Sequence, residues 1–169
     1  MATKWNLDPA HSEITFKVRH MMISNVKGEF TDFNVDLESA DETFKNVTAS
    51  AEIKTDSITT KNSERDAHLK SADFFNAEQN PVITFKTNSL NDEISGDITI
   101  NGVTKPINLD VEFGGVNVDP WGNTKAGFSF EGKIKRSDFN LNWNAALEAG
   151  GVMVSDDVKI AGELQFVKA

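Results

Sequence analysis

The segment SERDAHLK, residues 63–70, gathers side-chain types that hydrolytic enzymes use. Ser63, Asp66 and His68 could supply a nucleophile, an orienting carboxylate and a base. A catalytic triad, however, brings its base to the nucleophile from another structural element, and no Gly-x-Ser-x-Gly turn surrounds this serine. We therefore predict a short helix here, with Ser63 or Asn62 as its N-cap, and no enzymatic activity.

The same segment carries an apolar stripe. Leu69, Ala72 and Phe75 are spaced as on one face of a helix, so the helix would cover an opening of the domain. Arg65 and Asp66 would hold the helix in place through an ion pair or bonds to the backbone. Alternatively, Arg65 would face the anionic head of a ligand.

The three histidines could in principle bind a metal. His11 and His20 are separated by an odd number of residues, so they point to opposite faces of an unbroken strand, and His68 lies far along the chain. The chain has no cysteine and no H-x-x-x-H spacing. We predict no metal and no cofactor. His20, followed by Met21 and Met22, is a candidate polar group at a tunnel mouth, although methionines also fill cores.

Composition limits the function classes. The chain has 169 residues, 17 basic and 26 acidic side chains and a formal charge of −9, which disfavours binding to nucleic acid. It contains no apolar run long enough to span a membrane. The first residues, MATKWNLDPAHS, do not resemble a secretion leader. We expect a cytoplasmic protein if the sequence is complete, and a periplasmic one if a leader was removed.

Alternation of apolar and polar residues predicts most of the chain to be β-strand. Seven stretches show it: 13–20, 26–38, 45–54, 93–100, 103–113, 125–134 and 157–167. The stretch 81–87 gives an eighth, short strand whose polarity is ambiguous. The alternation changes parity within 26–38, which predicts a bulge or bend near Thr31–Asp32. Asn101–Gly102 predicts a hairpin turn. The segment 63–70 places the one helix between the third and fourth strands.

Such strands predict an all-β, eight-stranded antiparallel barrel formed by one domain over residues 1–169. The inward parity carries several small residues: Gly28, Ala49, Ala51, Gly96, Ala126, Gly132 and Gly162. A barrel of eight strands is wide enough to hold one small ligand, so these residues favour an open interior. The alternative is that the glycines only permit strand coiling and bulges.

Four stretches resemble the YceI-like family of bacterial proteins: WNLDPAHSEITFKVRHMMISNVKGEF, SITTKNSERDAHLKSADFFNAEQNPVITF, GDITINGVTKPINLDVEF and VSDDVKIAGELQF. The resemblance extends from Trp5 to about Phe166. It implies a lipocalin-like barrel whose internal hydrophobic tunnel holds a polyisoprenoid, an isoprenoid quinone or a related long lipid, and it implies a homodimer. The chain departs from the family at Asn80, where an aromatic residue often precedes the proline. The loop SDFNLNWNAALEAGG is also individual.

We predict that the protein binds, stores or transports a long-chain amphiphilic lipid without catalysis, such as a polyisoprenoid, an isoprenoid quinone or a fatty-acid derivative. The alternative is a filled barrel that acts as a protein-interaction or stress-related module. The predicted ligand-binding residues are Phe16, Val18, His20, Val26, Phe30, Ala49, Ala51, Arg65, His68, Ile98, Leu109, Val111, Phe128, Phe130, Ile160 and Leu164.

Overall fold

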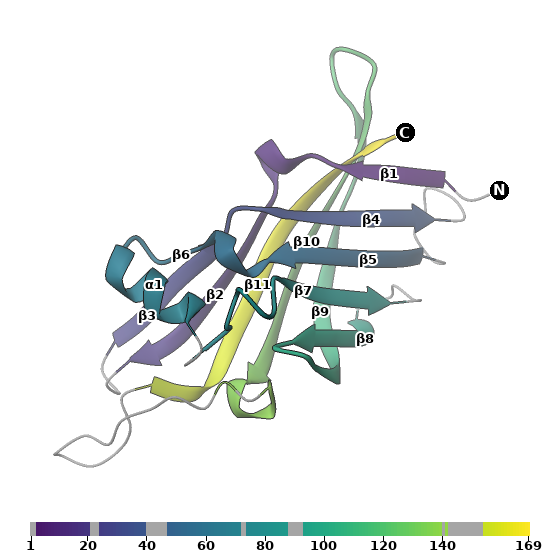
Figure 1. Cartoon of the computed structure of the whole chain (residues 1–169). Helices are drawn as coiled ribbons and strands as arrows, with labels where there is room; N and C mark the ends of the chain where they lie inside the picture. The colour runs from purple at the N-terminus through teal and green to yellow at the C-terminus, as the bar shows by residue number, and fades with distance from the viewer. Residues whose placement is uncertain are drawn as a thin grey trace, which may run out of the picture.

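The computed structural model describes residues 3–20, 24–39, 47–71, 74–87, 93–139, 141 and 154–169 (Figure 1). The strands within these ranges are β1 (Thr3–Leu7), β2 (Glu13–His20), β3 (Ser24–Phe30), β4 (Phe33–Ser39), β5 (Val47–Lys54), β6 (Ile58–Thr59), β7 (Val82–Thr87), β8 (Glu93–Ile100), β9 (Val103–Val118), β10 (Thr124–Lys135) and β11 (Val154–Lys168). The helical segments are α1 (Ser63–Lys70) and the 3-10 helices η1 (Pro9–His11), η2 (Thr55–Ser57) and η3 (Arg136–Phe139).

Eight strands close into a barrel. They pair in the order β1, β4, β5, β7, β8, β9, β10 and β11, and β11 pairs back with β1. The closing contact is short: Trp5 of β1 lies opposite Lys168 of β11 on one side and opposite Leu37 of β4 on the other. All these pairings are antiparallel. The predicted all-β, eight-stranded antiparallel barrel with one helix is therefore confirmed.

Three further strands extend the sheet from β11. The β2–β3 hairpin pairs with the part of β11 that precedes its contact with β1, and β6 pairs with β3. The chain bends at Thr31–Asp32 between β3 and β4, where the sequence changes parity. That predicted bend is confirmed, and it allows β3 to pair with β2 and β6 while β4 pairs with β1 and β5.

The predicted position of the helix is wrong. Helix α1 follows β6 instead of lying between the third and fourth strands. The number of strands before the helix differs because two short strands were not predicted and one predicted strand is two strands in the structure. Residues 3–7 and 58–59 form strands too short to show a clear alternation, and the predicted strand 26–38 breaks at its bend into β3 and β4.

Two turns follow directly from their residues. Asn101 and Gly102 both adopt positive φ angles, 54° and 76°, in the turn between β8 and β9, as the predicted hairpin requires. The β9–β10 hairpin projects beyond the barrel (Figure 1). Its tip is ordered by Asp119, whose Oδ1 accepts hydrogen bonds from the backbone N–H groups of Trp121 and Asn123, both at 2.9 Å.

The buried side chains form two clusters along the barrel. The first cluster includes the fully buried Trp5 of β1, whose indole N–H donates to Ser39 Oγ at 3.0 Å. The second cluster lies towards α1 and η3 and includes Ile58, Phe139 and Leu141. No helix in the described ranges is long and apolar enough to cross a membrane.

Candidate functional site: an apolar cavity inside the barrel

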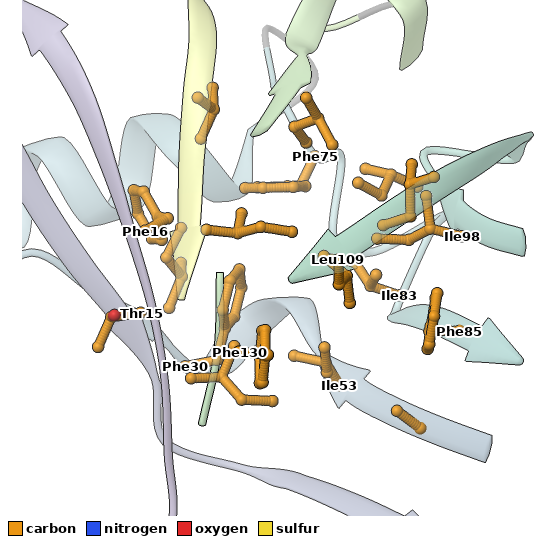
Figure 2. A pocket seen from close by; sticks show the side chains of 18 of the residues that line it. Thr15, Phe16, Phe30, Ile53, Phe75, Ile83, Phe85, Ile98, Leu109 and Phe130 are labelled. Atoms are coloured by element: carbon orange, nitrogen blue, oxygen red, sulfur yellow. The ribbon is translucent and has the colours of Figure 1, made fainter. Parts of the chain in front are cut away.

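A cavity of about 550 Å³ lies inside the barrel, between the strands and helix α1. Figure 2 shows Phe16, Phe30 and Phe130 gathered around this space, with Ile83 and Ile98 from other strands. The strands place these side chains there because alternate residues of each strand point inward. The volume lies within the range of roughly 300 to 1,000 Å³ that is common for small-molecule sites.

The cavity is apolar along its walls and polar at one end. Six of the described residues that line it have polar side chains: Thr15, Asn62, Glu64, Arg65, His68 and Arg136. Four of these six belong to α1 or to its N-cap. The remaining lining side chains are aliphatic or aromatic. Such a site suits a molecule with a long apolar part and a polar group near the helix.

The structure brings together fifteen of the sixteen residues predicted as ligand-binding. The residues around the cavity are Phe16, Val18, Val26, Phe30, Ala49, Ala51, Arg65, His68, Ile98, Leu109, Val111, Phe128, Phe130, Ile160 and Leu164. His20 ends β2, and its side chain lies outside the described part of the structure, as do Met21 and Met22. Binding of a ligand by these residues stays a prediction.

Several lining residues were not among those predicted. Val35, Leu37 and Ile53 share the inward parity of their strands, so the same alternation could have identified them. Ile83 and Phe85 of β7 also line the cavity, but three apolar residues near the start of this strand make its parity ambiguous. Phe74 and Leu141 lie outside the strands, where no periodic signal exists. Phe75 belongs to the apolar stripe predicted for the helix, but α1 ends at Lys70, so Phe75 lines the cavity from the segment that follows the helix.

The small inward residues do not all act as predicted. Ala49 and Ala51 line the cavity, but Ala126 is buried in the first core cluster. Larger side chains lie over the glycines. A Cβ atom built on Gly28 would lie 2.3 Å from the Phe16 ring, and one built on Gly162 would lie 2.4 Å from the Phe130 ring. The cavity is therefore not a row of gaps left by glycines, because rings from neighbouring strands occupy those positions.

Two further glycines are covered in the same way. A Cβ atom on Gly96 would lie 2.7 Å from the Phe85 ring, and one on Gly132 would lie 2.5 Å from Leu109 Cδ2. Phe85 and Leu109 both line the cavity. Large side chains that cover inward glycines are thus part of the wall on several strands.

Helix α1 is held at the polar end by its own first turn. The Asn62 side chain accepts a hydrogen bond from the Arg65 N–H at 3.1 Å and caps the helix. Asp66 Oδ1 accepts from the Thr60 N–H at 2.8 Å and from the Thr60 hydroxyl at 2.6 Å. Arg65 Nε donates to the same hydroxyl at 2.8 Å, and its Nη2 donates to the Thr60 carbonyl at 3.0 Å. Thr60, the residue after β6, therefore connects both Arg65 and Asp66 to the end of that strand.

These contacts support the structural interpretation of the SERDAHLK segment. The Asp66 oxygen that would orient a catalytic base is bonded to Thr60, and Ser63 is exposed. His68 lies at the cavity and packs edge-on against Phe74, with ring centres 5.0 Å apart. Arg65 also lines the cavity, which leaves a contact with a ligand head available in addition to its bonds to Thr60.

Arg136 is a polar lining residue that sequence reasoning missed. It begins η3, is only 5% exposed and donates from Nη1 to the Leu141 carbonyl at 2.6 Å. Burial lowers the pKa of its guanidinium, and the charge of Asp156 opposes this effect. No periodic pattern marks an inward arginine just after a strand. The side chain stabilises the chain between η3 and Leu141 at the wall of the cavity.

The histidines described by the structure do not form a metal site. His11 Nδ1 lies 2.8 Å from Asp8 Oδ2, and this hydrogen bond is the main reason why the pKa of the Asp8 carboxyl group is lowered. His68 lies on α1, at the cavity. Within the described ranges, no three histidine or carboxylate side chains are grouped as metal ligands.

Comparison with known proteins places the chain in a family. Residues 5–166 match the model of the YceI-like domain. The UPF0312 protein SERP2314 of Staphylococcus epidermidis is 43% identical over 166 residues, which is 97% of each chain.

Solved structures show the same fold. The YceI protein of Campylobacter jejuni is 35% identical, with a TM-score of 0.74 over 89% of this chain and 90% of the other. A polyisoprenoid binding domain from Saccharophagus degradans, implicated in plant cell wall breakdown, is 15% identical, with a TM-score of 0.72 over 98% of both chains. The protein with this barrel and this apolar cavity belongs to the YceI-like domain family.

Proposed function

We propose that the protein binds a long-chain amphiphilic lipid in its cavity and stores or transports it without chemical change. The lipid is a polyisoprenoid, an isoprenoid quinone or a fatty-acid derivative. The observation that carries this proposal is the cavity itself: about 550 Å³ of apolar space with its polar side chains concentrated at helix α1. The apolar chain would lie between the strands, and the polar group would lie near Arg65 and His68.

Burial of the apolar chain would supply the affinity. Each methylene group removed from water contributes about 0.8 kcal/mol, so ten buried methylenes would contribute on the order of 8 kcal/mol. Part of this is offset by the entropy lost when a flexible chain is immobilised. Ten methylenes alone would therefore give an affinity somewhat weaker than micromolar, and a longer buried chain would reach the micromolar range without a strong bond to the head group. A site that works in this way requires no catalytic residue.

The comparisons support the ligand class. The polyisoprenoid binding domain from S. degradans has the same fold over nearly its whole length. At 15% identity this likeness extends only to the fold, so the choice among polyisoprenoid, quinone and fatty-acid derivative rests on the dimensions of the cavity and on experiment. We also propose that the protein forms a homodimer, as the family resemblance implies.

The test is to identify what the protein carries. Protein purified from its own host would be extracted with organic solvent, and the extract would be analysed by mass spectrometry. We expect one long-chain species in a stoichiometric amount. A protein that carries no lipid, and that also fails to bind a prenol, a quinone and a fatty acid in titrations, would refute the proposal.

A further inference from the structure

Two phenylalanine rings at the cavity lie over glycines of the neighbouring strand. Phe16 of β2 is directly opposite Gly28 of β3, and Phe130 of β10 is directly opposite Gly162 of β11. A Cβ atom at Gly28 would lie 2.3 and 2.6 Å from two atoms of the Phe16 ring, and one at Gly162 would lie 2.4 and 2.6 Å from two atoms of the Phe130 ring. Each ring therefore occupies the volume that a side chain on the opposite residue would need.

The arrangement determines where the rings are. Residues directly opposite one another on antiparallel strands have Cβ atoms roughly 5 Å apart, so two inward side chains normally stand next to each other and point into the barrel. With glycine opposite, a phenylalanine ring can instead lie along the sheet and cover the exposed backbone. Phe16 and Phe130 do this, and both rings border the empty space of the cavity (Figure 2).

We infer that Gly28 and Gly162 determine the cross-section of the cavity, and hence which apolar chains it accepts, by keeping the rings of Phe16 and Phe130 against the wall. The inference rests on the proposed function, because it assigns the two glycines a part in ligand selection. Neither glycine needs to contact the ligand. A side chain at either position would displace the opposite ring towards the lumen, which is the empty space that the ring borders.

Gly28 is the better position for a test. The three atoms nearest to a Cβ atom there all belong to side chains, two in the Phe16 ring and Thr60 Cγ2 at 3.0 Å. At Gly162 the added atom would also lie 2.8 Å from the Glu13 carbonyl oxygen, and a clash with backbone would disturb the sheet. In Gly28→Ala, the ring must move by about 1 Å or more to reach ordinary contact distance. Gly127→Ala is the matched control, because a Cβ atom there meets no heavy atom within 4 Å.

The experiment measures displacement of a fluorescent apolar probe by dodecanol, hexadecanol and eicosanol. A displaced ring would remove the space of roughly one to two methylene groups, so Gly28→Ala should bind hexadecanol about tenfold more weakly than the parent. Gly127→Ala should stay within about twofold of the parent. In a Phe16→Ala background, the Gly28→Ala change should have no effect, because the ring that it displaces is absent.

Equal affinities of Gly28→Ala and Gly127→Ala would overturn the inference, as would a loss that persists in the Phe16→Ala background. If Gly28→Ala does not fold, the double variant relieves the contact and should fold; failure of that variant as well would also overturn it. If the parent binds neither these alcohols nor a prenol, a quinone or a fatty acid, the proposed function fails on its own. Uptake of xenon by the same variants then still decides the inference, since less xenon in Gly28→Ala supports it and equal uptake contradicts it.

Discussion

A tryptophan in place of Ala51 would fill the cavity from the wall formed by β5. Ala51 is half-buried, lies opposite Val35 and Phe85 on the two neighbouring strands and lines the cavity. Its side chain points inward, so an indole ring attached there has no route except into the lumen. Ala49, two residues earlier on the same face, offers the same opportunity.

The expected loss of affinity follows from the space that the ring takes. An indole ring adds nine non-hydrogen atoms, which would displace roughly six methylene groups of a bound chain. At about 0.8 kcal/mol for each buried methylene, the loss is on the order of 5 kcal/mol. This corresponds to a reduction in affinity of several thousandfold. A micromolar complex would no longer survive purification.

The assay compares lipid retained by the parent, Ala51→Trp and Ala49→Trp after purification from the same host. Ser50→Trp is the matched control, because Ser50 lies between the two alanines and is exposed on the outer face of the strand. Thermal unfolding would be measured for all four proteins. We expect all four to fold and only the two inward variants to lose the lipid. A folded Ala51→Trp protein that retains as much lipid as the parent would refute the assignment of the cavity as the lipid site.

Three further outcomes are expected. Asp66→Ala removes both bonds to Thr60 and should lower the free energy of unfolding by on the order of 2 kcal/mol in urea titrations, with faster proteolysis near α1; an unchanged midpoint would contradict this role. Trp5→Phe leaves the buried Ser39 hydroxyl without its donor and should cost roughly 1 to 3 kcal/mol, partly recovered by adding Ser39→Ala, in thermal unfolding. The pKa of the Asp119 carboxyl group is lowered, mainly by the hydrogen bond from the backbone N–H of Asn123. The contribution of this ionised group to stability is therefore present above pH 3.8 and is lost as the pH falls through the lowered pKa. An NMR titration of the Asp119 carboxyl group with a midpoint at or above pH 3.8 would contradict this prediction.

Much of the barrel could be predicted because strand alternation is a local signal. An inward face is indicated within five residues by the alternation of Ile14, Phe16 and Val18. The change of parity near Thr31–Asp32 predicts the bend between β3 and β4. The same alternation placed Ile160 and Leu164 at the cavity. Short segments carry too few residues for this signal, so β1 and β6 were missed and the helix was numbered wrongly among the strands.

The side-chain contacts at the polar end of the cavity could not be predicted from local sequence patterns. The sequence indicates that Arg65 and Asp66 begin a helix, but not that both side chains bond to Thr60. Nor does any pattern around Arg136 indicate that it is buried at the wall of the cavity. These partners depend on the course of the chain between elements, which residue spacing along one strand does not encode.

The sequence by itself determined that the chain forms a barrel and which residues of most strands face inward, because both follow from a repeat of two residues along each strand. Only the tertiary structure decided how large the interior is. The volume depends on which side chain lies opposite each glycine, and that is a matter of register between strands distant in the sequence, such as Phe130 opposite Gly162. The space beside a small inward residue can stay empty or be filled by an aromatic ring from the neighbouring strand. Which of the two occurs depends on the residue that strand pairing places opposite it.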